Sequence, residues 1–259
     1  MLPTTPPGDV DRKLLIEGLG KGLRVMEAFS DDASRLTATE AGHRAGLTRT
    51  AARRYLVSLV HYGYAGTDGK YYWLLPRVLR LGQGYLAAAR LPRLAQPFVQ
   101  RMSTRTGETA NLSVLDGHEI VYVARSNAPR VVSIGFHVGA RVPAHAVSPG
   151  YAILSTFTEP QLDAWIEAHE FGRFTPHTVS DPQRFRAGVL AARDLGYGSA
   201  DQLLDHGLRG LAVALTDRKG RCLGALSTTV QSQAYPGDTL VEGLLPPLQE
   251  VAQTLRGIV

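Results

Sequence analysis

The sequence predicts an α+β protein with a small helical N-terminal domain and a larger C-terminal domain that contains a sheet. Three observations lead to this prediction. The 259 residues are more than one core needs and enough for two. Most of the first 90 residues show helix-like repeats, interrupted by one hairpin signal. The remainder has strand-like segments near its start and near its end, with helix-like segments between them. The net charge of +5 lies wholly in the first part, because residues 1–90 hold 13 basic and 8 acidic side chains and residues 91–259 hold 15 of each.

The composition narrows the possible classes of protein. A hydrophobic content of 44% and a charged content of 20% are those of an ordinary soluble globular protein. With a single cysteine, Cys222, neither a disulfide nor a cysteine-based zinc site is possible within one chain, which favours a reducing compartment. The N-terminus lacks a signal-peptide pattern, and no apolar run of about 18 residues occurs. We therefore expect a cytoplasmic protein with no membrane partner.

The N-terminal domain is expected to begin with an amphipathic helix. Residues 1–15 are rich in Pro, Thr and Asp, and we expect a disordered arm there. In residues 16–29, apolar side chains recur every three or four positions, which is the period of a helix. The glycines between Gly18 and Gly22 do not fit a nucleotide-binding loop, because no strand precedes them and their spacing differs from that of the phosphate-binding motifs.

Residues 37–64 predict two short helices separated by a tight turn. Thr48 is placed to cap the second helix through its hydroxyl. The first two turns of that helix carry polar and basic side chains: Arg49, Thr50, Arg53 and Arg54. The opposite face is apolar: Ala52, Leu56 and Leu59. Such a helix fits the DNA major groove, although these residues alone equally allow a surface helix with a solvated basic face.

A hairpin signal follows the second helix. Asp68-Gly69 is typical of a tight turn, and the flanking Thr, Tyr and Trp residues favour strands. A hairpin directly after a recognition helix is a wing, so residues 16–75 are interpreted as a winged helix–turn–helix domain that binds double-stranded operator DNA. Lys70 in the turn contacts either a phosphate or only solvent. The basic charge of this part supports the interpretation, because attraction to a polyanion supplies the non-specific share of DNA affinity.

Residues 76–91 are expected to form a linker helix that starts at Pro76 and ends before Pro92. Its apolar residues between Val78 and Leu86 make it a candidate pairing surface, because helix–turn–helix proteins usually read DNA as two-fold symmetric dimers. Residues 92–259 then form the second domain. We expect strands at 110–115, 119–124, 131–136, 211–216 and 223–229, and helices at 94–106, 149–156, 159–168, 181–195 and 240–256. Strands first and last, with helices between, favour an α+β sensor-type sheet over a doubly wound fold.

The chain resembles the IclR family of bacterial transcriptional regulators over nearly its whole length. The segments that carry the resemblance are residues 19–23, residues 142–146 with Gly150, residues 207–209 and residues 223–227. The resemblance implies a linker helix and a C-terminal GAF-like α/β effector-binding domain. Within the family the chain is most similar to PobR- and PcaR/PcaU-type regulators of aromatic-acid catabolism, on residues 49–56, 72–74, 77–80, 91–92 and 123–126. This subgroup implies 4-hydroxybenzoate or a related hydroxybenzoate, a small aromatic carboxylate, as the effector.

The resemblance also implies the positions of an effector pocket: Ser148, Pro149, Gly150, Leu208, Arg209, Gly210, Ser227, Thr229, Arg125 and His137. Two departures from the family concern this region. Tyr151 stands where lysine is common, and Gly210 stands where cysteine is frequent. We therefore expect the ligand contacts to differ in detail.

Several of these residues have a chemical reason to bind an acid. Ser148, Pro149 and Gly150 open a helix, whose free backbone N–H groups attract a carboxylate; a plain helix cap is the alternative. Ser227 and Thr229 share one face of a strand because they are two residues apart. An arginine is a good partner for a carboxylate. Arg209 therefore binds either the effector or a neighbouring aspartate, Asp201 or Asp205.

Other classes of protein receive less support. A hydrolase-type enzyme on the second domain lacks a Gly-x-Ser-x-Gly elbow, and an architectural DNA-binding protein has no need of a large neutral second domain. A regulator of another pathway that senses a non-aromatic acid remains the main alternative. We expect no cofactor and no metal site, with His145 structural and His118 and His169 on the surface, because the histidines lack ligand spacing. A homodimer is expected, and the resemblance allows a tetramer.

Overall fold

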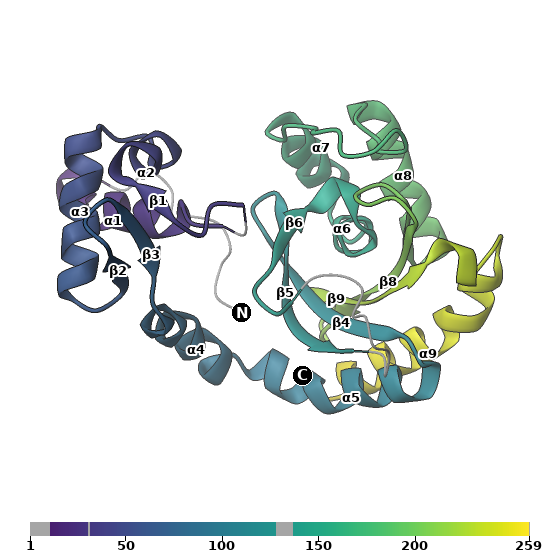
Figure 1. Ribbon diagram of the computed structural model, residues 1–259. Helices are drawn as coiled ribbons and strands as arrows, with labels where there is room; N and C mark the ends of the chain where they lie inside the picture. Colours follow the sequence, from purple (N-terminus) through teal and green to yellow (C-terminus); the bar gives the residue numbers. More distant parts are fainter. Residues whose placement is uncertain (1–10, 31, 128–136, 259) are drawn as a thin grey trace. The chain divides into compact units, whose positions relative to one another are not determined.

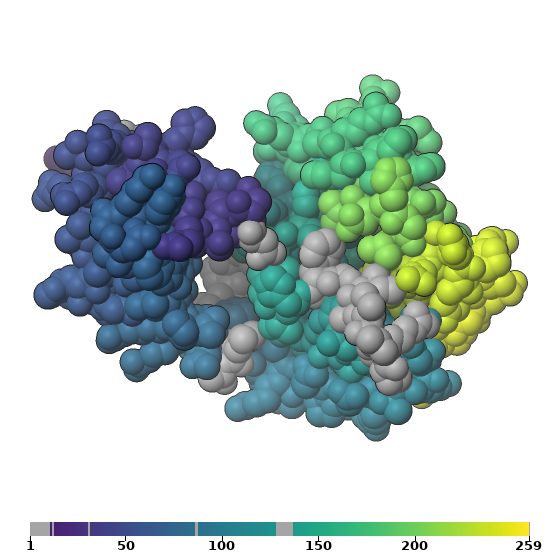
Figure 2. All heavy atoms as spheres, viewed as in Figure 1, coloured from purple at the N-terminus to yellow at the C-terminus, as the bar shows by residue number. Residues whose placement is uncertain are grey.

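The computed structural model describes residues 11–30, 32–127 and 137–258. The chain divides into two compact units, with the division between Tyr85 and Leu86 (Figure 1). Figure 2 shows the side chains of both units, purple to blue for the N-terminal unit and teal to yellow for the C-terminal unit. The first ten residues of the expected arm and the strand expected at 131–136 lie outside the described residues.

The N-terminal unit consists of three helices and a small sheet. The helices are α1 (Glu17–Glu27), α2 (Ala38–Ala45) and α3 (Arg49–His61), after a single 3-10 turn at Arg12–Leu14. The antiparallel sheet has the order β1-β3-β2, with β1 at Leu36–Thr37, β2 at Ala65–Thr67 and β3 at Tyr71–Leu74. The winged helix–turn–helix architecture is thus confirmed, whereas β1, only two residues long, was not predicted.

Sequence-local features fix the turn between α2 and α3. Thr37 and Glu40 form a capping box that starts α2, and Gly46 ends it with a φ of 65°. Gly42 permits the close approach of the two helices, because a Cβ there would lie 2.8 Å from the carbonyl oxygen of Leu47. The buried side chains of this unit, among them Val25 and Leu56, form one core.

The linker region differs from its prediction at one boundary. A 3-10 turn at Pro76–Val78 leads into α4 (Leu79–Ala88), and α5 then runs from Arg90 to Thr106. We expected α5 to begin after Pro92. It begins at Arg90, four residues before the predicted start at 94, because a proline in the first helical turn loses no intrahelical hydrogen bond.

The C-terminal unit is built on one six-stranded antiparallel sheet with the order β6-β5-β4-β9-β8-β7. The long central strands are β4 (Thr109–Asp116), β5 (Glu119–Ser126), β8 (Leu208–Thr216) and β9 (Cys222–Gln231). The predicted strands at 110–115, 119–124, 211–216 and 223–229 fall within them. The edge strands, β6 (Arg141–Pro143) and β7 (Gly198–Asp201), are short and were not predicted.

Helices cover both faces of this sheet (Figure 1). On one face lie α6 (Ser148–Leu154), α7 (Glu159–Glu167) and α8 (Pro182–Leu195), with a core that includes Leu154, Trp165 and Phe185. On the other lie α5 and α9 (Thr239–Arg256), with a separate core. Alternate residues of each central strand therefore face α6 and α9 in turn. This alternation decides which strand residues reach the candidate site.

Candidate functional site

The exposed face of α3 carries the residues predicted to contact DNA. Thr48 caps the helix, because its hydroxyl oxygen accepts a hydrogen bond from the Ala51 N–H at 3.3 Å. The side chains at the start of the helix are exposed: Arg49, Thr50, Arg53 and Arg54. Among the described residues, none of these three arginines takes part in an ion pair. The back of the helix is buried through Ala52 and Leu56, so the basic face is held outward.

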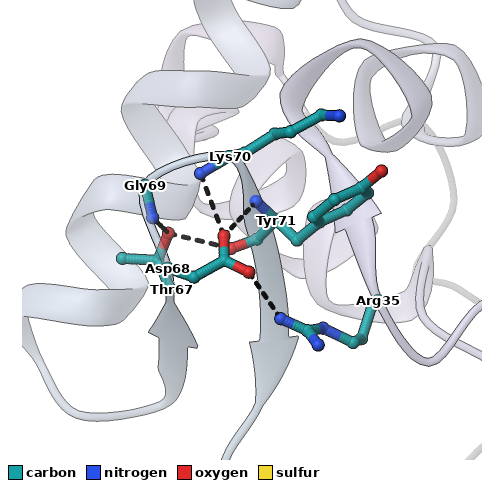
Figure 3. A network of polar contacts seen from close by, with 6 residues as sticks. All are labelled: Arg35, Thr67, Asp68, Gly69, Lys70 and Tyr71. Carbon is teal, nitrogen blue, oxygen red and sulfur yellow. Dashed lines mark hydrogen bonds and ion pairs between the residues drawn. The ribbon is translucent and has the colours of Figure 1, made fainter.

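The turn of the wing is held by hydrogen bonds within five consecutive residues (Figure 3). Asp68 Oδ1 accepts hydrogen bonds from the N–H groups of Lys70 at 3.0 Å and Tyr71 at 2.8 Å. These bonds, that of Tyr71 first, hold the pKa of the Asp68 carboxyl below its ordinary value. Thr67 adds two more, because its hydroxyl accepts from the Gly69 N–H and donates to the Tyr71 carbonyl. Gly69 itself has a φ of 94°.

A second layer of contacts ties the wing to the strand before α2. Arg35 donates to Asp68 Oδ2 at 2.6 Å, and its guanidinium lies 4.6 Å from the Trp73 ring centroid. The indole of Trp73 in turn covers Gly66, where an added Cβ would lie 2.7 Å from ring atoms. Lys70 is exposed, with Nζ 4.9 Å from the Tyr71 ring centroid. The acidic residue of the wing is therefore neutralised locally, and lysine is left at its tip.

A pocket lies on the α6 face of the C-terminal sheet. Apolar side chains line most of it: Tyr122, Val147, Leu203, Leu204 and Leu208. Ser148, Thr229, Asp205 and Arg209 add polar groups. The space open to the centre of a water-sized sphere is about 40 Å³, a few times the roughly 10–15 Å³ that one water needs. The pocket is therefore small and mostly apolar.

Three glycines let the start of α6 sit directly on neighbouring backbone. A Cβ at Gly150 would lie 1.8 Å from the carbonyl oxygen of Ala144, and one at Gly198 would lie 2.5 Å from that of Ser148. A Cβ at Gly210 would lie 2.7 Å from Ser148 Oγ. Gly210 thus leaves the space in which the hydroxyl of Ser148, a buried residue, borders the pocket.

The start of α6 offers fewer backbone donors than a helix N-terminus usually does. Pro149 has no N–H, and the N–H of Gly150 donates to the Val147 carbonyl at 3.0 Å. The helix is only seven residues long. The side chain of Ser148 is therefore a more evident polar group at this end of the pocket than the backbone is.

Two polar residues on the strands that flank the pocket residues Tyr122 and Thr229 carry buried atoms without a hydrogen-bond partner. They are Asn111 on β4, at its Nδ2, and Ser227 on β9, at its Oγ. The two residues are directly opposite each other in the β4–β9 register. Ser227 was predicted as a pocket residue, but Asn111 was not, because a single asparagine in a strand carries no signal in sequence.

The remaining predicted pocket residues fall into two groups. Arg125 is half-buried on the same face, where its Nη1 donates to Asn111 Oδ1 at 3.4 Å and burial lowers its pKa. Arg209 lines the pocket as well. Its Nη1 donates to the carbonyls of Tyr235 and Gly237, and its Nε lies 3.4 Å from Asp201 Oδ2. His137 is exposed. Arg209 therefore borders the pocket and faces Asp201 at the same time, so both alternatives for it stay open.

The departure from the family at Tyr151 does not reach the pocket. Its ring packs on Phe185 with centroids 5.0 Å apart, and a Cβ at Gly188 would lie 3.0 Å from its Cε1. Tyr151 therefore fills space between α6 and α8. The departure at Gly210, in contrast, does line the pocket.

A histidine cluster beneath α6 corrects one prediction. His118 and His169 are partly buried and stack on each other at 5.0 Å, whereas we expected both on the surface. His145 Nε2 donates to the Gly172 carbonyl at 2.9 Å, so its Nδ1 accepts from His169 Nε2 at 2.7 Å. Burial, His145 and His118 lower the pKa of His169 to about 4. His145 is structural, as predicted.

A winged helix–turn–helix unit joined to a domain with a small-molecule pocket defines the class of ligand-responsive transcriptional regulators. The sequence comparison identifies the family. Residues 83–256 match the bacterial transcriptional regulator IclR C-terminal domain, and residues 18–69 match the IclR helix-turn-helix domain. The chain belongs to the IclR family.

Three similar proteins give this assignment detail. The p-hydroxybenzoate hydroxylase transcriptional activator of Acinetobacter baylyi is 39% identical, with 94% of this chain and 92% of that protein covered. The PobR inducer-binding domain of Acinetobacter, a double mutant solved with 3-hydroxybenzoic acid, is 34% identical with a TM-score of 0.62, over 66% of this chain and 100% of that one. An IclR homologue of Microbacterium hydrocarbonoxydans, solved with 4-hydroxybenzoate, is 27% identical with a TM-score of 0.74, over 93% and 99%.

Two features are absent from the described residues, a membrane-spanning helix and a group of metal ligands. No helix among them has the length and apolar character to cross a membrane. In that same part of the chain, no three His, Cys, Asp or Glu side chains are grouped as metal ligands would be.

Proposed function

We propose that this protein is a cytoplasmic, non-enzymatic regulator of aromatic-acid catabolism that binds a hydroxybenzoate, with 4-hydroxybenzoate as the first candidate. The observation that carries the proposal is the small, mostly apolar pocket with polar groups in its lining, in a chain similar over its length to the p-hydroxybenzoate hydroxylase transcriptional activator. Apolar side chains suit the ring of an aromatic acid, and the polar groups suit its carboxylate and ring hydroxyl.

Calorimetric titration of the intact protein tests this proposal. We expect 4-hydroxybenzoate and 3,4-dihydroxybenzoate to bind and to raise the melting temperature, because a ligand that binds only the folded state stabilises it by mass action. Cyclohexanecarboxylate has the carboxylate but no flat ring, and we expect it to bind more weakly. Equal binding of cyclohexanecarboxylate would favour the alternative of a non-aromatic acid. No binding of any aromatic acid, by protein that still binds operator DNA, would contradict the proposal.

The DNA contacts are proposed from the exposed face of α3 and from the wing. Arg49, Thr50 and Arg53 are assigned to base edges, because they follow the capped N-terminus that enters the major groove. Arg54 and Lys70 are assigned to phosphates. The support is their exposure together with the absence of ion pairs to the three arginines among the described residues.

A homodimer is proposed from exposed apolar side chains of the linker helix. Leu79, Leu81 and Tyr85 of α4 are 66%, 52% and 50% exposed. Leu19 and Leu23 of α1 are exposed as well. Such residues on a regulator of this class are expected to pair two copies over a two-fold symmetric operator. Sedimentation of the intact chain distinguishes this dimer from the tetramer that the family resemblance also allows.

A further inference from the structure

A row of polar side chains crosses the sheet on the face that α6 covers. In the strand register, Asn111 of β4 is opposite Arg125 of β5 on one side and Ser227 of β9 on the other. Directly paired residues on neighbouring strands have their Cβ atoms about 4.5–5.5 Å apart. The three side chains therefore form one polar line in a face that is otherwise largely apolar.

Two members of this row have unmet hydrogen-bonding capacity. Asn111 is 1% exposed and Ser227 is 2% exposed, yet Asn111 Nδ2 and Ser227 Oγ have no partner. Buried polar groups are almost always paired, because an unpaired one keeps the full cost of its lost hydration. An unpaired pair of such groups next to a pocket indicates that their partner is a ligand.

The position of Asn111 relates the row to the pocket. Tyr122 and Thr229 both line the pocket, on β5 and β9 respectively. In the register, Tyr122 pairs with Ser113 and Thr229 pairs with Thr109, so Asn111 lies on β4 midway between those two pairs. A ligand that extends from Thr229 towards Tyr122 passes over Asn111.

The orientation of Asn111 shows which chemistry the row accepts. Arg125 Nη1 can only donate, so the Asn111 atom that faces it is the carbonyl oxygen, Oδ1. Nδ2 then points away as a donor, and the Ser227 hydroxyl is a second donor beside it. In the pocket lining itself, Asp205 and Arg209 contribute one charge of each sign and so favour neither orientation. The two donors of the row, with the Arg125 cation beside them, favour a carboxylate there.

We propose that Asn111 Nδ2 and Ser227 Oγ bind the carboxylate of the ligand, so that its ring hydroxyl points to Ser148 and the start of α6. This inference rests on the proposed function, since it assumes an aromatic acid in the pocket. The sequence left two places for the carboxylate open, the start of α6 and the hydroxyls of Ser227 and Thr229, and the proposal selects the second. The start of α6 fits a carboxylate less well, because Pro149 lacks an N–H and that of Gly150 is already bonded.

Two probes and three variants of the intact protein test the orientation by calorimetry. Benzoate has only the carboxylate, and 4-hydroxybenzoate has both groups. Asn111→Asp keeps the shape but replaces the donor with a negative charge. We expect Asn111→Asp to weaken the binding of both probes by the same factor, roughly 10- to 100-fold, as for the loss of a hydrogen bond to a charged group. Ser227→Ala weakens both by about tenfold. Ser148→Ala changes the ratio of the two dissociation constants instead.

The controls separate this inference from folding and from the proposed function. Ser199→Ala makes the same change as Ser227→Ala at an exposed position of β7 and should bind both probes as the wild type does. Should Asn111→Asp fail to fold by circular dichroism, Ser227→Ala decides alone, because it removes an oxygen that bonds to nothing in the ligand-free protein.

Three results would contradict either the proposed function or the inferred orientation of the ligand. Wild-type protein that binds neither probe contradicts the proposed function itself. Variants at 111 and 227 that bind both probes normally overturn the inference and leave the function standing. If these variants lose the binding of 4-hydroxybenzoate but bind benzoate normally, the row binds the ring hydroxyl, and the ligand lies in the opposite orientation.

Discussion

The wing and the pocket use their polar groups in opposite ways. In the wing, Asp68 receives two backbone N–H groups from within three residues and one guanidinium from Arg35. In the pocket, Asn111 and Ser227 come from strands more than a hundred residues apart in sequence, and each leaves a buried atom unpaired. The polar groups of the wing are thus paired within one short segment, whereas those beside the pocket come from distant segments and leave two atoms that we propose a ligand to pair.

Complete and incomplete hydrogen bonding suit the different functions of the two regions. A recognition surface benefits from complete internal bonding, because the side chains left over are those that contact DNA. A ligand site keeps unmet donors, because their bonds are then made only when the ligand binds. Three predictions test the comparison, and they follow from the largest expected effect to the smallest.

The largest effect is expected from glycines that serve the two regions differently. Gly150→Ala should destabilise the C-terminal unit by about 4 kcal/mol or more, because its Cβ would lie 1.8 Å from a distant carbonyl oxygen. In Gly69→Ala, the added Cβ meets no atom within 4 Å, and only the φ of 94° is unfavourable for alanine. We expect the wing variant to lose about 1–2 kcal/mol of stability.

Tryptophan fluorescence in urea measures both effects, since Trp73 lies in the N-terminal unit and Trp165 in the C-terminal unit. Variants that keep one tryptophan each report one unit at a time. Gly243→Ala in α9 is a matched control, because nothing lies within 4 Å of its added Cβ. A Gly150→Ala protein as stable as this control would contradict the close approach of Ala144.

An intermediate effect is expected from the arginines of α3, which we propose to contact DNA and which are exposed. Arg53→Ala should weaken operator binding by about 1–3 kcal/mol and relax the preference among operator sequences, because a base contact is lost. Arg54→Ala should weaken binding to all DNA sequences alike and lower the salt dependence of that binding, as loss of a phosphate contact does. Fluorescence anisotropy over a range of salt concentrations measures both. Equal operator binding by Arg53→Ala would remove that residue from base recognition.

The smallest effect is a pH dependence confined to the C-terminal unit. The pKa of His169 is lowered to about 4, against an ordinary value of 6.5. Between these values the unfolded chain binds a proton that the folded protein does not, so stability falls as the pH is lowered from 6.5 towards 4 and stops falling on this account below it. His169→Gln should flatten the profile of Trp165 unfolding over that window. An unchanged slope would show that His169 titrates normally.

The parts of the structure that sequence predicts are those set by neighbouring residues. The period of α1, the cap at Thr48 and the turn at Asp68-Gly69 each depend on fewer than fifteen consecutive residues, and the structure contains all of them. The long central strands were predicted for the same reason. The strands β1, β6 and β7 were missed, because two to four residues are too few to show alternation.

The candidate site was predictable only in part. Ser148, Gly210 and Thr229 were inferred through the family resemblance, and all three line the pocket. Asn111 was missed because its surroundings depend on the register of three strands. The cluster of His118, His145 and His169 was missed because its members come from three separate segments. Arg209 was expected either in the pocket or beside an aspartate, and the fold places it at both, in the pocket lining and 3.4 Å from Asp201.

Gly210 keeps space open in the pocket lining beside Ser148. A Cβ there would already lie 2.7 Å from Ser148 Oγ, so any side chain at 210 takes its volume from the space beside that hydroxyl. A cysteine at 210 would therefore either displace residue 148 or reduce the volume of the pocket. The room at this point of the pocket depends on a residue that has no side chain.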